Sequence, residues 1–345
     1  MKIEHHVNLQ AHNTMGLPCV VDALFTVEDA SDYATLAKAI AALPTHTATF
    51  ILGSGSNVIL PANLRGMVIK IETRGITKQS EDADTVTVSV QAGEPWHDFV
   101  LHCVAQGWHG LENLAYIPGT VGAAPMQNIG AYGTEVRECI ESVNLCTLDL
   151  QLGQAIFSEI SGKNCEFSYR DSIFKRSAPQ SHLVSIITAV VFRLSKIYVP
   201  KTHYGDLQKY GEITSAAQMV AAVTAIRKAK LPDPAEIGNA GSFFKNPVVS
   251  ATQCANLLAL HPTLPHYAQT SGEFKLAAAW LIERCGFKGK RYGAVGMHAK
   301  QALVLVNYGE ANADAVWGLA NVVLETVQQK FGVRLEAEPV RVAAV

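Results

Sequence analysis

A short run of small residues, Gly53-Ser54-Gly55-Ser56-Asn57, directly follows an apolar, strand-like stretch that ends at Leu52. Glycine lets backbone N–H groups turn toward a phosphate, and serine and asparagine side chains add hydrogen-bond donors. The pattern predicts a pyrophosphate cradle, and a plain tight turn is the alternative interpretation. Val58 occupies the third glycine position of the fingerprint GxGxxG, and no Gly-Lys-Ser or Gly-Lys-Thr follows. Neither a Rossmann site nor a P-loop is therefore indicated.

A second segment, residues 118–133 (PGTVGAAPMQNIGAYG), is too rich in glycine and proline for regular structure, yet too apolar for an ordinary solvated loop. Such a segment brings bare backbone close to a large, flat ligand, and a flavin would suit it. A glycine-rich packing loop between domains is the alternative. The predicted cofactor contacts in this segment are Pro118, Gly119, Thr120, Gly122, Ala123, Ala124, Gln127, Asn128, Gly130, Tyr132 and Gly133.

Four further residues carry cationic or phenolic side chains that suit an anionic substrate. Tyr169 and Arg170 are adjacent, and an arginine beside a tyrosine can clamp a carboxylate or phosphate. An exposed surface pair is the alternative interpretation. The segment that begins at Tyr204 and the lysine Lys230 raise the same choice, because Lys230 can instead complement the C-terminal end of its helix.

The segment 238–247 (GNAGSFFKNP) places the hydroxyl of Ser242 among glycines and aromatic residues. A helix N-cap or a turn is the ordinary role for an isolated serine. The segment lacks the GxSxG nucleophile elbow, so acyl transfer is not suggested.

The elements between these segments alternate helix and strand patterns, which indicates α+β architecture. Period-two alternation predicts a strand over 85–91, and apolar spacing with a closing Gly107 predicts a helix over 96–106. The other predicted elements are a helix over 31–42 ended by Pro44, strands over 47–52, 184–194 and 302–307, helices over 214–230, 276–285 and 312–331, a glycine loop over 238–246 and an extended segment over 333–345.

Composition and charge limit the possible functions. A length of 345 residues favours two or three domains, and a net charge of -2 leaves no global basic field for nucleic acid or anionic membrane. The seven cysteines form no CxxC pair, so we expect reduced thiols and no metal site. The first residues lack the apolar core of a signal peptide, and no apolar run is long enough to span a bilayer, so we expect a cytoplasmic protein.

Seven motifs in one order resemble the UDP-N-acetylenolpyruvoylglucosamine reductase family over nearly the whole chain. The Tyr204 motif resembles the family's type I subgroup, in which a tyrosine-bearing loop closes over the substrate. The seven are GSGSN at 53–57, PGTVGAAPMQNIGAYG at 118–133, SYRDS at 168–172, YGD at 204–206, KLPDP at 230–234, GNAGSFFKNP at 238–247 and LEAE at 335–338.

The resemblance implies two FAD-binding subdomains of the vanillyl-alcohol-oxidase (PCMH) type and an α+β substrate-binding domain. We expect subdomain 1 over 1–75, subdomain 2 over 76–230 and the substrate domain over 231–332, with 333–345 returning to the site. The implied reaction is reduction of an enolpyruvyl ether to UDP-N-acetylmuramate in peptidoglycan precursor synthesis. Noncovalent FAD would deliver hydride from its N5 to the vinyl carbon, with NADPH as electron donor. We expect a monomer with no nucleic-acid or membrane partner.

Matching motif positions imply roles for individual residues. Ser242 would donate the proton, Glu338 would be its acidic partner, and Arg170 would bind the substrate carboxylate. Hydride addition leaves negative charge on the neighbouring carbon and its carboxylate, so cations such as Arg170 and Lys230 fit the need. The implied substrate-binding residues are Tyr169, Tyr204, Lys230, Asn246, Lys288 and Gln301.

Two departures from the family pattern affect these expectations. Ala123 and Ala124 replace serines found in some members, which puts FAD affinity in doubt. Relatives have proline between the two late acids and valine after the second, so Glu336 is an alternative to Glu338. Two other functions remain open: an oxygen-using flavoenzyme that oxidises a sugar or alcohol, and a nucleotide-sugar-binding protein without catalysis.

Overall fold

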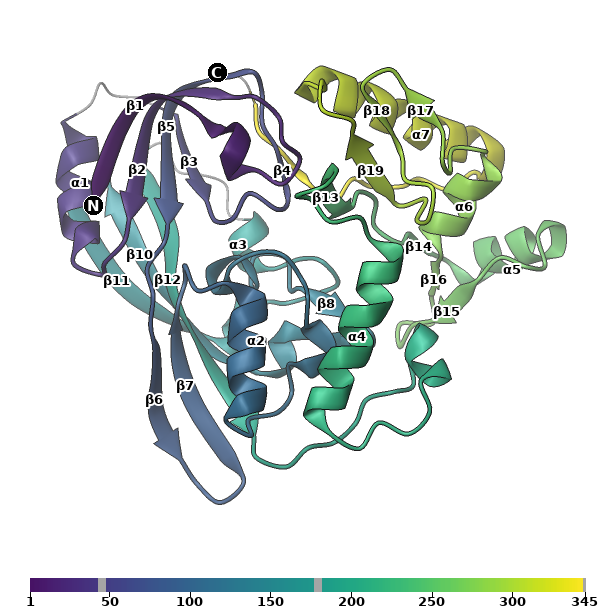
Figure 1. Cartoon of the computed structure of the whole chain (residues 1–345), viewed down its shortest axis with the longest axis horizontal. Coiled ribbons are helices and arrows are strands. Elements are labelled where there is room, and N and C mark those ends of the chain that lie inside the picture. Colours follow the sequence, from purple (N-terminus) through teal and green to yellow (C-terminus); the bar gives the residue numbers. More distant parts are fainter. Residues whose placement is uncertain (43–47, 177–181, 344–345) are drawn as a thin grey trace.

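The computed structural model describes residues 1–42, 48–176 and 182–343, and its chain forms three sheet-based regions in sequence order (Figure 1). The first region is a four-stranded sheet in the order β1-β2-β5-β3, with β1 antiparallel to β2 and the other pairs parallel. Helix α1 (Asp32–Ala41) connects β2 to β3. The strands are β1 (Lys2–Asn8), β2 (Val20–Val27), β3 (Thr49–Leu52) and β5 (Asn63–Ile71).

The second region is an antiparallel five-stranded sheet in the order β11-β10-β12-β7-β6. Every second residue of β7 is fully buried, at Val86, Val88 and Val90, which accounts for the period-two alternation of its sequence. The elements are β6 (Ile76–Glu81), β7 (Thr85–Gln91), α2 (Trp96–Ala105), the short pair β8 (Gly130–Ala131) and β9 (Thr134–Glu135), β10 (Ile140–Asp149), β11 (Gln154–Ser161), α3 (Ile173–Arg176) and β12 (Leu183–Ser195).

The third region follows helix α4 (Ala216–Lys230) and contains two small sheets. One has the order β13-β19-β18-β17 and packs with α6 and α7, and the other has the order β14-β16-β15 beside α5. The elements are β13 (Gly238–Ser242), β14 (Val248–Val249), α5 (Ala251–Leu260), β15 (His266–Ala268), β16 (Phe274–Leu276), α6 (Ala278–Arg284), β17 (Arg291–Tyr292), β18 (Val295–Met297), β19 (Val304–Asn307) and α7 (Ala313–Phe331).

The sequence predicted these elements unevenly. The strand over 85–91 is confirmed to the residue, and the predicted helices agree within about two residues at each end. The helix-ending Pro44 and the strand start at Thr47 lie outside the described residues. The glycine loop expected over 238–246 was wrong in its first half, which is strand β13 with an irregularity before Ser242. A left-handed Gly241 (φ 71°) produces that irregularity, and glycine adopts such a φ at little cost.

Buried side chains join the first two regions more tightly than the third. One core contains residues of β2, α1, β7, β12 and α4, so both large sheets share it. A second core surrounds α7 and includes Met15 and Leu17 from the loop before β2. Apolar contacts therefore anchor the third region to the N-terminal part of the chain.

The C-terminal segment leaves α7 and returns to the first region (Figure 1). Strand β20 (Val340–Arg341) pairs in parallel with β4 (Val58–Ile59), directly after the glycine loop 53–57. Ala337 forms a bridge with Phe244, just beyond β13. The C-terminal segment is thus tied to the segments that carry the candidate chemistry.

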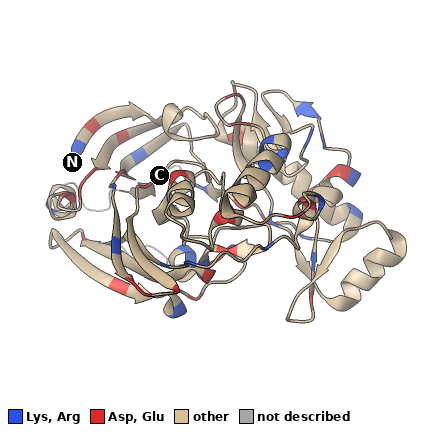
Figure 2. Ribbon diagram, turned by 60° about the horizontal axis from the view of Figure 1, so that its bottom comes forward, with Lys and Arg blue, Asp and Glu red and all other residues tan. Residues whose placement is uncertain are grey.

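Surface and charge features are unremarkable outside the site. Lys and Arg alternate with Asp and Glu over the ribbon and form no continuous basic stripe among the residues drawn (Figure 2). None of the described helices is both long and apolar enough to cross a membrane. All seven cysteines are free of disulfides.

The loop 53–57 is held so close to the turn at residues 12–14 that one of its glycines leaves no room for a side chain. A Cβ on Gly55 would lie 2.1 Å from the carbonyl oxygen of His12, whereas a Cβ on Gly107 would meet nothing within 4 Å. Both glycines are left-handed, with φ of 68° and 71°.

We expect Gly55→Ala to lower the free energy of unfolding by more than about 3 kcal/mol, because backbone must move as well as adopt a disfavoured φ. The matched control Gly107→Ala should cost only the left-handed conformation, about 1–2 kcal/mol. Urea unfolding of the two variants measures both values. Equal losses would show that the close approach at Gly55 is not a constraint.

Candidate active site

The two glycine-rich segments that the sequence singled out lie against each other. Ser56 Oγ donates a hydrogen bond to the carbonyl oxygen of Pro118 at 3.2 Å. A Cβ on Gly53 would lie 3.0 Å from Thr120 Oγ1, and one on Gly119 would lie 3.5 Å from Ser56 Oγ. Segments more than 60 residues apart therefore form one surface of nearly bare backbone.

Loop 53–57 presents unpaired donors. The backbone N–H groups of Ser54, Gly55, Ser56 and Asn57 donate to no other residue within the described ranges. Consecutive N–H groups without partners form an anion-binding surface of the kind that holds phosphates. This arrangement fits the pyrophosphate of a dinucleotide cofactor.

Segment 118–133 is held by backbone hydrogen bonds to the turn between β7 and α2. Val121 N donates to Glu94 O at 2.9 Å, and Gly122 N donates to Ala92 O at 2.8 Å. A Cβ on Gly122 would lie 2.5 Å from Ala92 Cβ, so only glycine fits there. Of the two alanines that replace serines in some relatives, Ala124 is buried in the core, so only Ala123 is placed to affect a ligand.

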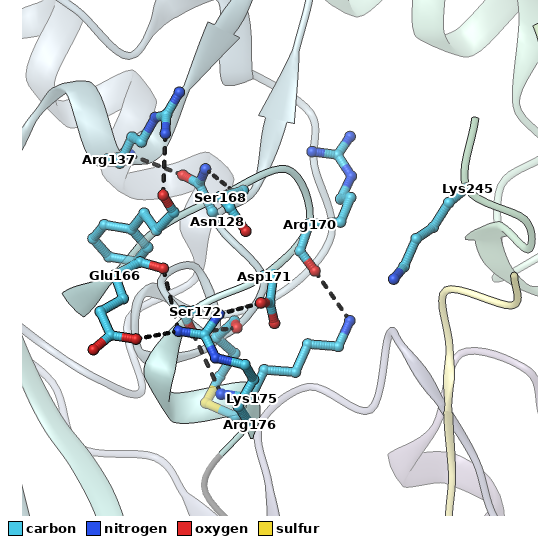
Figure 3. Close-up of polar contacts among 12 residues, drawn as sticks. Asn128, Arg137, Glu166, Ser168, Arg170, Asp171, Ser172, Lys175, Arg176 and Lys245 are labelled. Carbon is cyan, nitrogen blue, oxygen red and sulfur yellow. Dashed lines mark hydrogen bonds and ion pairs between the residues drawn. The ribbon is translucent and has the colours of Figure 1, made fainter. Parts of the chain in front are cut away.

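Asn128 differs from its predicted role as a cofactor contact. It is fully buried, and its side-chain amide donates to Glu135 Oε2 at 3.0 Å. The amide also donates to Ser168 O at 3.0 Å, and its Oδ1 accepts from Arg137 N (Figure 3). The hydrogen bonds of this side chain are made to other groups of the protein. Asn128 therefore connects the glycine-rich segment to the loop that carries Arg170.

Arg170 and Glu338 meet at the centre of the site. Arg170 Nε lies 3.3 Å from Glu338 Oε1, and both side chains are mostly buried, with 19% and 13% of their surface exposed. Arg170 also donates to Gly130 O at 2.6 Å. Burial and these contacts exclude the alternative of an exposed Tyr-Arg surface pair.

Amide side chains from both glycine-rich segments complete this contact. Gln127 Nε2 donates to Glu338 Oε1 at 3.2 Å, and Asn57 Nδ2 donates to Gln127 Oε1 at 3.0 Å and to Glu338 O at 3.4 Å. Residues 57, 127, 170 and 338 therefore form one network. Its members come from four separate stretches of the chain.

Of the two late acids, Glu338 faces the site and Glu336 faces solvent. Glu336 is 68% exposed and forms an ion pair with Lys245 at 2.9 Å. That lysine holds the pKa of Glu336 below its usual range. Strand alternation alone would place both acids on the same face, because residues two apart share a face. Their different partners therefore distinguish them, since Glu338 contacts Arg170 and Gln127 whereas Glu336 contacts Lys245.

Ser242 ends strand β13 opposite Val304 and caps no helix, so the N-cap interpretation is wrong. Its hydroxyl makes no hydrogen bond with the part of the chain that the structure describes. The backbone N–H of Glu338 donates to Phe243 O at 2.8 Å. Ser242 and Glu338 are thus brought onto adjoining backbone segments.

Tyr169 lies beneath two cations. The guanidinium carbon of Arg170 is 5.4 Å from the ring centroid, and Lys275 Nζ is 4.6 Å from it. Burial raises the pKa of Tyr169, and burial followed by the charge of Arg170 lowers the pKa of Lys275. Sequence analysis missed Lys275, because a single lysine in a short strand carries no motif of its own.

The predicted Tyr204 loop closes on segment 118–133. Tyr204 stacks on Tyr267 with ring centroids 6.1 Å apart, and a Cβ on Gly133 would lie 3.4 Å from Tyr204 Cβ. Asp206 of the same loop forms an ion pair with Lys230, and Lys209 and Lys230 together lower the pKa of Asp206 to about 2. Lys230 is therefore held by this loop as well as lying at the end of α4.

The remaining predicted substrate residues are placed less centrally. Asn246 Oδ1 accepts from the backbone N–H of Ala278, so its side chain supports the start of α6. Gln301 Oε1 accepts from Leu303 N at 3.3 Å, in the strand connection next to Ser242. Lys288 pairs with Glu283 at 3.1 Å, and the structure does not bring it to the Arg170 network.

A second missed cation is Arg227 of α4. Its Nε donates to Tyr116 O at 2.9 Å, and burial lowers the pKa of the guanidinium. Neither of its terminal nitrogens pairs with a carboxylate among the described residues. No sequence pattern distinguishes Arg227, because an arginine in the last turn of an amphipathic helix is common.

Comparisons with known proteins identify two family models and many curated relatives of this chain. Residues 233–342 match the family model described as "UDP-N-acetylenolpyruvoylglucosamine reductase, C-terminal domain", and residues 21–149 match the model described as "FAD binding domain". The UDP-N-acetylenolpyruvoylglucosamine reductase of Chromobacterium violaceum is 47% identical, with 96% of this chain and 97% of the relative covered. That of Cupriavidus pinatubonensis is 49% identical over the same shares.

The arrangement of the sheets also has a solved counterpart. The UDP-N-acetylenolpyruvylglucosamine reductase of Thermus caldophilus superposes with a TM-score of 0.66 at 24% identity, covering 99% of this chain and 100% of that one. At this identity the likeness establishes the fold alone. It agrees with the predicted α+β architecture.

Proposed function

The chain belongs to the UDP-N-acetylenolpyruvoylglucosamine reductase family. We propose which of its residues bind the cofactor, bind the substrate and transfer the proton in the family's reaction. It is a flavin-dependent oxidoreductase with FAD as cofactor. It reduces the enolpyruvyl ether of UDP-N-acetylglucosamine to UDP-N-acetylmuramate in peptidoglycan precursor synthesis. The residue roles that follow are proposals, supported by the positions of the side chains.

Two segments would hold the FAD. Loop 53–57 offers four unpaired N–H groups to the pyrophosphate, and the glycines of 118–133 let backbone approach a flat ring. No covalent attachment is required. Bound FAD, once reduced by NADPH, would supply the hydride that the vinyl carbon receives. Buried Asn128 and Ala124 would shape the second segment from behind instead of contacting the cofactor.

The substrate is an anion, and its groups would meet the cations of the site. Arg170 would bind the carboxylate, and its charge would stabilise the negative charge that develops beside it. Lys275 adds a second positive charge over Tyr169. Tyr204 and Lys230 would engage the diphosphate, because Asp206 holds Lys230 against the Tyr204 loop.

Ser242 would donate the proton to the carbon left electron-rich by hydride addition. Such a carbon is basic enough to accept a proton from a hydroxyl held within hydrogen-bond reach. Glu338, on the adjoining segment, would be its acidic partner, and Arg170 and Gln127 fix its orientation. The single observation that carries the proposal is this convergence of Ser242, Glu338 and Arg170 beside the glycine-rich segments.

We further propose that NADPH is the electron donor and that the protein works as a monomer in the cytoplasm, where nucleotide sugars are made. The domain division we propose is 1–75, 76–230 and 231–332, with the C-terminal segment returning to the first. The separate sheets support that division. Residues 344 and 345 lie outside the described part of the segment.

We expect the purified protein to carry noncovalent FAD and to oxidise NADPH in proportion to the enolpyruvyl UDP-sugar consumed. Acid precipitation should release the flavin into the supernatant, where its absorbance measures the stoichiometry. A colourless protein that cannot be reconstituted with FAD would contradict the proposal. Oxygen-dependent turnover of a sugar without NADPH would instead favour an oxidase.

Ser242→Ala should separate the two half-reactions, because reduction of the flavin by NADPH needs no protein acid and product formation does. Anaerobic NADPH should bleach the flavin at a near wild-type rate. Reoxidation by the substrate should slow by at least about a hundredfold, the usual lower bound for a lost general acid. Ser242→Cys should recover part of the loss. Stopped-flow absorbance measures both steps, and equal effects on both would assign the proton to another group.

Glu338→Gln and Glu336→Gln form a matched pair that tests which late acid acts at the site. Glu338→Gln should slow substrate-driven reoxidation by at least about tenfold, because it removes the charge beside the proton donor. Glu336→Gln should stay within about twofold and change unfolding free energy by at most about 1 kcal/mol, as for an exposed ion pair. The opposite order in stopped-flow and urea unfolding would reassign the role to Glu336.

A further inference from the structure

Residues with left-handed backbone gather around the site. Among the described residues, six that are not glycine have positive φ, namely His6, Tyr116, Asn128, Tyr132, Glu166 and Arg170. Four of these, Tyr116, Tyr132, Glu166 and Arg170, share a further feature. Such a conformation is unfavourable for residues with a Cβ and persists only where surrounding contacts impose it. The contacts that impose it here can be identified.

In all four cases a side chain donates a hydrogen bond to the carbonyl oxygen of the left-handed residue itself. Fixing that carbonyl fixes the peptide plane that follows the strained residue, so each donor acts as a clamp on the backbone. The clamps are Arg227 Nε to Tyr116 O at 2.9 Å, Asn113 Nδ2 to Tyr132 O at 3.0 Å, Arg176 NH2 to Glu166 O at 3.5 Å and Lys175 Nζ to Arg170 O at 3.2 Å.

Of the four donors, Lys175 is the one that bonds to a member of the network formed by residues 57, 127, 170 and 338, because it donates to the carbonyl of Arg170 (Figure 3). Lys175 comes from the short helix α3, five residues beyond Arg170. Its ammonium is half-buried and faces Lys245, while Glu338, Asp171 and Arg170 also lie within electrostatic range. Burial, and then the charge of Lys245, lower the pKa of Lys175.

No carboxylate forms an ion pair with Lys175 among the described residues, and the Arg170 carbonyl is the acceptor its ammonium has there. Partial burial of an ammonium beside another lysine is unfavourable without compensation. An exposed or paired lysine would avoid this cost. The hydrogen bond to the Arg170 carbonyl therefore compensates part of the cost of burying the Lys175 ammonium.

We propose that Lys175 is a positioning residue for the reaction. Together with the two backbone hydrogen bonds between Ser168 and Asp171, its hydrogen bond to the Arg170 carbonyl holds the left-handed backbone. This backbone in turn aims the guanidinium at Gly130 O and Glu338. The inference rests on the proposed role of Arg170 toward the substrate carboxylate. Lys175 itself touches neither the reacting atoms nor the donor serine in this scheme.

Lys175→Met should release Arg170 from its left-handed conformation. We expect KM for the enolpyruvyl UDP-sugar to rise, and substrate-driven reoxidation to slow, by about tenfold to a hundredfold, as small misplacements of a binding group do. FAD content and NADPH-driven reduction should stay within about threefold. Lys175→Arg, which retains a donor, should recover most of the loss. Lys163→Met, which removes an exposed lysine's charge nearby, is the control and should behave as wild type.

A readout independent of turnover decides the mechanism. In a crystal structure of Lys175→Met, Arg170 should leave positive φ and its guanidinium should leave Gly130 O, and titration with UDP-N-acetylmuramate should show weaker binding. If activity falls while Arg170 keeps its conformation, Lys175 acts through its charge and the inference is wrong. Unchanged kinetics would also overturn it. If the wild type fails to reduce the UDP-sugar, the proposed function is wrong. The crystal structure of Lys175→Met would still show whether Lys175 holds the Arg170 backbone.

Should Lys175→Met not fold, the Arg variant carries the test. A guanidinium at 175 that restores folding and binding with Arg170 still left-handed supports the clamp. Restoration with Arg170 in another conformation contradicts it.

Discussion

Arg170 and Glu338 lie 3.3 Å apart with little exposure to solvent, and each needs the other because an isolated charge is costly to bury. The pair also joins distant parts of the chain. Glu338 comes from the C-terminal segment, Arg170 from the loop before α3, and Gln127 and Asn57 bring in the two glycine-rich segments. Removing one member would leave a buried charge unpaired and disconnect the segments that surround it. The geometry of the site is therefore a property of the whole fold.

The sheets supply rigidity, and the loops supply unusual backbone. Both large sheets share one apolar core, which fixes the ends of the loops that leave them. Within those loops, close approach excludes side chains at Gly55 and Gly122. Four left-handed residues there accept a side-chain hydrogen bond at their own carbonyl. Strain concentrated in loops on a rigid scaffold is typical of functional sites. Here it places carbonyl groups and N–H groups where regular structure could not.

Sequence patterns predicted the regular elements well where one periodicity dominated, as in the strand at 85–91 with its buried valines. They also located the segments that gather at the site, because glycine-rich or cation-bearing motifs are local. Sequence patterns did not predict which side chains of different segments contact each other in the folded chain. Lys275 and Arg227 sit in ordinary elements and become notable only when Tyr169 and Tyr116 fold against them. The glycine-rich motif predicted Asn128 as a cofactor contact, whereas in the structure its side chain is buried and bonds to Ser168 and Arg137.

The late acid shows why the site depends on completion of the fold. Glu338 reaches Arg170 because its own N–H donates to Phe243 O, while its neighbours pair with Phe244 and β4. Strand β4 directly follows the loop 53–57, whose N–H groups from Ser54 to Asn57 have no partner among the described residues. The same docking that orients the acid therefore also fixes one end of the proposed cofactor loop. A partly folded chain would have neither the paired charges nor a fixed anion-binding loop. The proposed proton donation and cofactor binding would thus be coupled through one strand pairing, although Asn57 and Glu338 are 281 positions apart in the sequence.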